Sequence, residues 1–95
     1  MEYSYPIDLS WSQEEMVDVV NFLSAVEEAY EAKMDAQQLN RLYKKFKQVA
    51  PGKAEENNIY KDFKKVSGYD GYLVIKAMKD ELLKEQPKAI SLKIK

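Results

Sequence analysis

The residues of this sequence that could do chemistry are carboxylates, lysines and tyrosines. Histidine and cysteine are both absent. Their absence removes zinc sites built on these ligands, thiol nucleophiles, serine–histidine–aspartate triads and any pH switch based on an imidazole. The carboxylate groups that remain could serve in acid–base catalysis or bind a hard cation. These groups are Glu14/Glu15, Glu27/Glu28/Glu31 and Glu55/Glu56.

No spacing sets one of these carboxylate groups apart from the others. A di-metal helical bundle needs a Glu-x-x-His partner, which a sequence without histidine cannot supply. Because glutamates are rarely buried, the groups are interpreted as solvated helix faces and helix caps. We therefore expect no catalytic residue, no metal ligand and no cofactor. An enzyme is the distant alternative and would require a cleft of carboxylates or lysines with shifted pKa values.

A basic stretch offers a second chemistry, the binding of a phosphate backbone. Its candidate face consists of Arg41, Lys44, Lys45, Lys61, Lys64 and Lys65. Aromatic residues such as Tyr43 and Phe46 lie between these cations, but their spacing places them on the buried stripes of helices. The two segments joined at Pro51-Gly52 also fit a helix-turn-helix, as any two consecutive helices do. A nucleic-acid-binding accessory protein is therefore the alternative function.

Aromatic residues near the chain's N-terminus and its last predicted helix favour a protein-interaction surface. Tyrosine and tryptophan are enriched at interfaces because they bring a large contact area at low entropic cost. The candidate surface consists of Tyr3, Tyr5, Pro6, Trp11, Tyr69 and Tyr72. The leading hypothesis is a non-enzymatic module that binds a protein partner or itself. The alternative is that Trp11 and its neighbours only close one end of the core.

Length and composition indicate a single helical domain over residues 1–95. The chain is 45% hydrophobic and 33% charged, with room for one core but not for a large internal cavity. Residues 1–35 carry nine acids and one base, whereas residues 36–95 carry fourteen bases and seven acids. These halves either neutralise each other or present a basic face to an anionic partner. Without cysteine, a signal-peptide pattern or an apolar run long enough to span a membrane, the expected location is the cytoplasm.

Hydrophobic periodicity predicts an all-α fold, a compact array of about four short helices with an extended N-terminal arm. The helices are expected at about 13–32, 36–49, 53–66 and 71–85. For the third helix, the predicted buried stripe is Ala54, Ile59, Tyr60, Phe63 and Val66. Short links between the helices favour antiparallel neighbours.

Capping residues mark the ends of these helices. Ser12 with Glu15 predicts a capping box at the start of the first helix, and Asp35 and Asp70 can cap the second and the fourth. Gly68 stands where a left-handed C-cap residue is expected. The Gly-Tyr-Asp-Gly segment that begins there resembles in outline the nucleotide clamp of KH modules, but a helix stop followed by a helix start explains it more simply.

Both ends of the chain alternate apolar and polar residues, which is the period of an extended strand. Residues 1–11 are interpreted as an extended arm laid over the helices, or at most as an edge strand, because Pro6 excludes a central strand. The tail, residues 87–95, carries Ile90, Leu92 and Ile94 on one side. It is expected to pair with the arm in a two-stranded ribbon, to pair with another chain or to be disordered.

Short motifs in the same order along about residues 3–80 make the chain similar to a known family. They are Tyr5-Pro6-Ile7-Asp8, Trp11-Ser12, Glu15-Met16, Val26-Glu27, Ala29-Tyr30-Glu31, Tyr43-Lys44-Lys45-Phe46-Lys47, Pro51, Lys53-Ala54-Glu55-Glu56 and Ser67-Gly68-Tyr69. The chain resembles the YktA-like proteins, small chains of bacilli and related Gram-positive bacteria. This resemblance implies a compact array of helices in the bacterial cytoplasm, with no activity, cofactor or catalytic residue to carry over. Gly52 stands where a serine is expected in that family, which weakens the N-cap of the third helix, and the tail after Pro87 has no counterpart in the resemblance.

Overall fold

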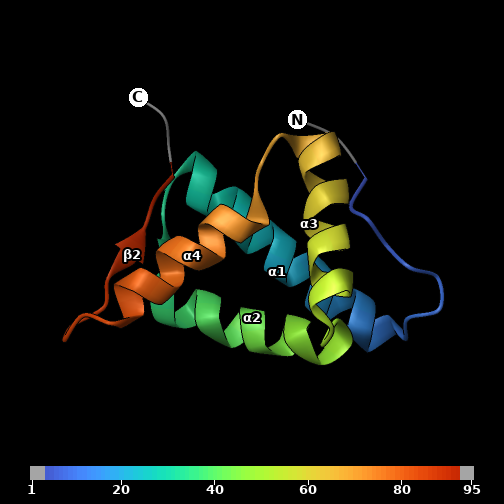
Figure 1. Cartoon of the computed structure of the whole chain (residues 1–95), viewed down its shortest axis with the longest axis horizontal. Coiled ribbons are helices and arrows are strands. Elements are labelled where there is room, and N and C mark those ends of the chain that lie inside the picture. Colours follow the sequence, from blue (N-terminus) through green and yellow to red (C-terminus); the bar gives the residue numbers. More distant parts are fainter. Residues whose placement is uncertain (1–3, 93–95) are drawn as a thin grey trace.

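Four helices and a two-stranded sheet make up the computed structural model, which describes residues 4–92. The helices are α1 (Gln13–Glu31), α2 (Ala36–Val49), α3 (Lys53–Ser67) and α4 (Gly71–Leu82), and the strands are β1 (Met34–Asp35) and β2 (Ala89–Ile90). The expected compact array of four helices is confirmed, with the small sheet as an addition. Figure 1 shows α1 and α2 running in opposite directions, α4 lying across α1, and α3 standing at one end of the group. Among the described residues, no helix is both long and apolar enough to cross a membrane.

The core forms where α1 packs on α2, the most extensive helix pairing of the fold. Phe22 of α1 stacks on Phe46 of α2 with ring centroids 4.4 Å apart, and both side chains are fully buried. Phe63 of α3 and Met78 of α4 close the core from the other helices. Burial of these large apolar side chains is the main favourable contribution to folding.

Local capping signals set the predicted helix starts. The Ser12 hydroxyl accepts from the Glu15 N–H at 3.1 Å, and the Glu15 carboxylate accepts from the Ser12 N–H at 2.8 Å, so the capping box is confirmed. Asp35 caps α2 and Asp70 caps α4 through their carboxylates. Gly68 ends α3 with a left-handed φ of 81°, which a residue with a Cβ adopts only at a cost. The end of α3 at Gly68 and the start of α4 after Asp70 account for this segment without a nucleotide clamp.

The predicted buried stripe of α3 is wrong at its two ends. Ala54 and Val66 are exposed, and the inward positions are taken instead by Glu56 and Ser67. At about 100° per residue, Ser67 falls between Phe63 and Tyr60 on the inward side, whereas Val66 falls just outside that side, beyond Ile59. Ser67 is satisfied there, because its hydroxyl donates to the Phe63 carbonyl at 2.7 Å and accepts from the Tyr69 N–H at 3.0 Å.

Helix α4 ends at Leu82, three residues before the predicted end at 85. The N–H groups of Leu83 and Lys84 bond back by three residues, to the carbonyls of Asp80 and Glu81, which tightens the last turn and stops the helix. The Glu81 carboxylate then accepts from the Lys88 N–H at 2.9 Å and directs the chain backwards. This contact between residues seven apart has no signature in the hydrophobic periodicity.

The described part of the tail pairs with β1, not with the described part of the N-terminal arm. β2 runs antiparallel to β1, with Met34 opposite Ile90 and Asp35 opposite Ala89. The Leu92 N–H donates to the Ala29 carbonyl at 2.8 Å, and the Ser91 hydroxyl donates to the Ala32 carbonyl at 2.7 Å. Carbonyls at the C-terminal end of a helix have no partner inside it, so the tail satisfies groups that α1 leaves open. Ile94, part of the predicted stripe, lies outside the described residues.

If the tail is part of the core, shortening its buried side chain destabilises the whole fold. Ile90 is 6% exposed, and Ile90→Ala should lower the free energy of unfolding by about 2 kcal/mol, measured by urea denaturation followed by circular dichroism. Leu83→Ala is the matched control, because Leu83 is 86% exposed and its truncation should change stability by about 0.5 kcal/mol or less. Equal effects of the two variants would contradict the packed position of the tail.

Candidate functional site: a pocket beneath the N-terminal arm

The N-terminal arm, residues 4–12, is fastened to the helices at both ends. Near its start, the ring of Tyr5 stacks on Phe63 with centroids 5.8 Å apart, and the Tyr5 hydroxyl donates to the Glu27 carboxylate of α1. Burial and the hydrogen bond to Glu27 raise the pKa of Tyr5 to about 12, so this hydroxyl keeps its proton at neutral pH. At its end, the arm enters α1 through the capping box.

Between these attachments, the arm makes a tight turn that presents Asp8. The Trp11 N–H donates to the Asp8 carbonyl at 3.0 Å, and the Ser10 N–H and hydroxyl both donate to Asp8 Oδ1, at 2.9 and 2.7 Å. An aspartate that accepts from residues two positions ahead is typical of such turns. The bonds from the Ser10 backbone and then from its hydroxyl lower the pKa of Asp8, so the carboxylate is ionised at neutral pH.

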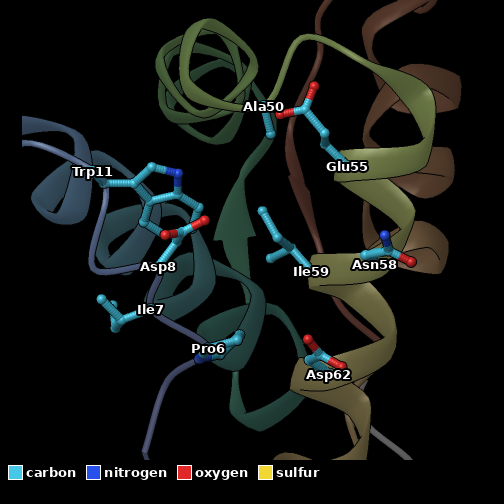
Figure 2. Close-up of a pocket in the computed structure, with 9 residues that line it drawn as sticks. All are labelled: Pro6, Ile7, Asp8, Trp11, Ala50, Glu55, Asn58, Ile59 and Asp62. Carbon is cyan, nitrogen blue, oxygen red and sulfur yellow. The ribbon is translucent and has the colours of Figure 1, made fainter.

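A pocket of about 310 Å³ opens between this turn and α3, and we call it the arm pocket. Its lining residues are Pro6, Ile7, Asp8, Trp11, Ala50, Glu55, Asn58, Ile59 and Asp62. Figure 2 shows the arm residues on one side of the space and the α3 residues on the other, with Ile59 between them. Ile59 and Ala50 are buried and form the apolar base, and Trp11 forms an aromatic wall.

The arm pocket carries negative charge and no positive charge. Asp8 from the arm, and Glu55 and Asp62 from α3, are all exposed, and no basic side chain lines the space. Among the described residues, Glu56, Asp70 and Glu81 form ion pairs with lysines, and none of these three acids belongs to the pocket. Carboxylates beside an indole suit a positively charged group, which the carboxylates attract and the ring face stabilises. Among the same residues, no cluster of acids has the arrangement of a metal site.

The predicted aromatic surface separates into three places. Pro6 and Trp11 line the arm pocket. Tyr5 and Tyr69 lie along α1, where their hydroxyls donate to Glu27 and Glu31 on consecutive turns. Tyr72 lies on α4, is 56% exposed and lines a different cleft. Tyr3 lies outside the described residues. Trp11 is also partly buried against the core, as the alternative of core closure expects.

The predicted basic face is spread over the outer sides of two helices. Arg41, Lys44 and Lys45 are exposed on α2, and Lys61 and Lys65 are exposed on α3. Lys64 is paired with Asp70 at 3.6 Å. Lys45 borders a shallow depression that it shares with the acids Glu14 and Asp18 of α1. No single pocket gathers the six cations among the described residues.

A buried carboxylate lies on the inward side of α3, and its prediction as a solvated group was wrong. Glu56 is 7% exposed and joins α2 to α3: its carboxylate accepts from Lys47 at 2.7 Å, from Tyr43 at 3.0 Å and from Tyr60. Its neighbour Glu55 is exposed, as predicted. Burial raises the pKa of Glu56, but the bonds from Lys47, Tyr60 and Tyr43 outweigh burial, so the net shift is downward.

The hydrogen bonds to Glu56 also keep the hydroxyls of Tyr43 and Tyr60 protonated. Burial and the bond to Glu56 raise the pKa of Tyr43 to about 12, and the pKa of Tyr60 rises further for the same reasons. The start of α4 lies close to Tyr60: a Cβ on Gly71 would come within 2.7 Å of the Tyr60 ring. Gly71 therefore allows α4 to begin directly against this ring.

Fold and site together define a small helical protein with an electronegative surface pocket. A protein-family model described as "Uncharacterised protein family (UPF0223)" matches residues 2–86. A UPF0223 protein of Streptococcus gordonii is 54% identical over 78 residues, covering 82% of this chain and 85% of the relative. A UPF0223 protein of Staphylococcus saprophyticus is 51% identical over 78 residues, covering 82% of this chain and 85% of the relative. Another, of Oceanobacillus iheyensis, is 45% identical over 80 residues, covering 84% of this chain and 91% of the relative. The chain belongs to the UPF0223 family, and the resemblance to a family of Gram-positive bacteria is confirmed.

The buried carboxylate of Glu56 has a measurable signature in stability. At pH 7, Glu56→Gln should lower the free energy of unfolding by about 2 kcal/mol, because a charged acceptor of three hydrogen bonds is lost. Since the folded pKa of Glu56 lies below the ordinary value of 4.5, its contribution is full above that value and is lost as pH falls through the folded pKa. The difference between wild type and Glu56→Gln should therefore shrink below pH 4.5 in a urea series.

Glu55→Gln is the control for this measurement. It removes the same charge one residue away, at an exposed position, and should shift stability by about 0.5 kcal/mol or less at pH 7. A difference for Glu56→Gln that stays constant through the acid range would contradict the bonded, ionised carboxylate.

Proposed function

We propose that this protein is a non-enzymatic protein-interaction module of the bacterial cytoplasm, and that the arm pocket receives a basic side chain of a partner. The arm pocket itself carries the proposal: about 310 Å³ with a tryptophan wall, a base of Ile59 and Ala50, and three carboxylates without a cation. A free pocket of this charge attracts an arginine or a lysine. The apolar base accommodates the methylene stem of such a side chain, and the acids receive its charged head.

Apolar side chains beside the pocket supply a second contact. Leu9 at the tip of the turn is 90% exposed and Ile7 is 38% exposed. A partner segment with an apolar residue next to the basic one would cover both side chains. Interfaces of this kind concentrate their energy in a few anchors that fill pockets. The stacked and capped arm supports the proposal further, because a pre-formed pocket costs little ordering on binding.

The ionised state of Asp8 supports binding over catalysis. A general acid or base is effective when its pKa is shifted towards the working pH. The hydrogen bonds from Ser10 shift the pKa of Asp8 in the opposite direction, downward. Asp8 thereby provides a permanent charge for recognising a cation.

Occupancy of the arm pocket can be measured through Trp11, the only tryptophan of the chain. Titration with N-acetyl-arginine amide should change the fluorescence of Trp11 and saturate, whereas N-acetyl-citrulline amide, of nearly the same shape but uncharged, should have little effect. Asp8→Asn/Glu55→Gln/Asp62→Asn should weaken the arginine probe about tenfold or more, because each carboxylate is a charged acceptor.

The matched control removes three charges elsewhere. Glu14→Gln/Glu28→Gln/Glu85→Gln changes exposed acids outside the arm pocket and should leave the affinity within about twofold, apart from screened long-range attraction. Equal weakening by both triple variants, or equal binding of the citrulline probe, would reject the pocket as the recognition site. In cells, a photo-crosslinker placed at Leu9 should capture a partner when the three pocket acids are present and should capture none in the triple variant of the arm pocket. Sedimentation velocity of the purified protein then distinguishes a foreign partner from a second copy of this chain.

Nucleic-acid binding is the second candidate function, favoured by the exposed Arg41, Lys44 and Lys45 on α2 and Lys61 and Lys65 on α3. It predicts an affinity for short duplex DNA or RNA that falls steeply with salt, because phosphate contacts release counterions. Lys44→Gln/Lys45→Gln should reduce the slope of the logarithm of the binding constant against the logarithm of the salt concentration by about two, because two phosphate contacts are lost. A flat slope, with affinity no better than that of an unrelated protein of similar charge, dismisses this function.

A further inference from the structure

A second cleft lies on the other side of α3 from the arm pocket. Its volume is about 210 Å³, and its lining residues are Tyr43, Lys53, Glu56, Asn57, Tyr60, Tyr72, Ile75, Lys76 and Lys79. On α3, Lys53, Asn57 and Tyr60 follow one another at helical spacing, and on α4 Tyr72, Lys76 and Lys79 do the same. Residues 55, 58 and 62, which line the arm pocket, fall on the opposite side of α3, because an α-helix turns by about 100° per residue. We call this second space the lysine cleft.

The lysine cleft has an excess of positive charge. Lys53, Lys76 and Lys79 are exposed, and none of them forms an ion pair within residues 4–92. The one acid of the lining, Glu56, is already compensated by Lys47 at 2.7 Å and bonded to two tyrosine hydroxyls. Lys79 lies over the ring of Tyr43, 5.8 Å from its centroid, and this contact leaves the ammonium N–H groups free to donate.

The unused polar groups of the lysine cleft are mostly donors. Besides the three ammonium groups, the Asn57 amide and the Tyr72 hydroxyl have no partner in the described part of the chain. The hydroxyls of Tyr43 and Tyr60 donate to Glu56, which removes their protons from use by a ligand. A complementary ligand is therefore anionic and rich in acceptors. A phosphate group has this chemistry, and lysines bind it as point charges.

We propose that the lysine cleft binds the phosphate group of a small anionic ligand. Its volume of about 210 Å³ is below the roughly 300–1,000 Å³ typical of drug-sized ligands, so it holds a phosphate and the atoms next to it rather than a large molecule. The rings of Tyr43, Tyr60 and Tyr72 provide apolar surface for those adjoining atoms. This ligand is independent of the partner proposed for the arm pocket, because the two sites share no lining residue.

Inorganic phosphate, adenosine 5′-monophosphate and adenosine test the cleft in NMR titrations of the ¹⁵N-labelled protein at constant ionic strength. Phosphate and the monophosphate should give saturable shifts at the amides of Lys53, Asn57 and Lys76, and adenosine should give none. If the monophosphate binds more tightly than phosphate, the additional affinity comes from contact between the adenosine part and the tyrosine rings. Saturation by adenosine without phosphate, or the same shifts with chloride alone, would overturn the proposal.

Variants separate the lysine cleft from general surface charge. Lys76→Gln/Lys79→Gln should weaken binding of the monophosphate about tenfold or more, and Lys53→Gln on the other helix should weaken it in the same direction. Lys61→Gln/Lys65→Gln removes two exposed lysines of α3 outside the cleft and should leave the affinity within about twofold. Thermal unfolding checks that every variant is folded. Equal weakening by the cleft pair and the control pair would contradict a defined site and indicate diffuse attraction to the basic faces.

Discussion

The buried carboxylate of Glu56 is the constraint on which both surface sites depend. A carboxylate out of water is strongly unfavourable unless it is paired and hydrogen-bonded. Glu56 meets this requirement only when Lys47 and Tyr43 of α2 and Tyr60 of α3 all reach it, at an otherwise limited contact between those two helices. Together with the burial of Phe63, this bonding sets which side of α3 faces inward. Once that side is set, the arm pocket and the lysine cleft fall on its two flanks.

The ends of the described chain complete what the helices leave open. The arm covers α1 and α3 through Tyr5 and supplies half of the arm pocket. The tail donates hydrogen bonds to the carbonyls of Ala29 and Ala32, which have no partner within α1 because they lie at its C-terminal end. A chain of 95 residues buries only about 60–65% of its unfolded surface, so segments outside the helices contribute substantially to the core. Arm and tail both contact the C-terminal half of α1, the arm at Glu27 and the tail at Ala29 and Ala32, and within residues 4–92 they form no strand pairing with each other.

Charge on the surface is organised differently from charge along the sequence. By halves, the chain is acidic first and basic afterwards. In space, the arm pocket takes Asp8 from the acidic half but Glu55 and Asp62 from the basic half. The lysine cleft takes its three cations from the basic half alone. The polarity that matters for recognition therefore lies across α3, with acids on one flank and lysines on the other.

Much of the fold was predictable because it rests on local signals. Ser12, Asp35, Gly68 and Asp70 mark helix ends through contacts with residues two to four positions away, and such contacts are visible in a sequence. The end of α4 was not, because it depends on the bond between Glu81 and the Lys88 backbone. The candidate site was predictable only in part: Pro6 and Trp11 were identified as members of the candidate surface, but Tyr5 and Tyr69 turned out to be engaged with the carboxylates of α1.

By itself, the sequence determined which residues share a helix face. The spacing of Glu55, Asn58 and Asp62, and of Tyr72, Lys76 and Lys79, follows from the helical repeat alone. Only the tertiary structure decided what each face meets. The turn of Asp8 lies against the first set, and Lys53 of α3 lies across a cleft from the second, because the packing of α3 on α2 and α4 brings together segments far apart in the chain. The burial of Glu56 belongs to the same class. Helical spacing places it on the face of Tyr60 and Phe63, but only the tertiary structure brings Lys47 and Tyr43 of α2 to its carboxylate.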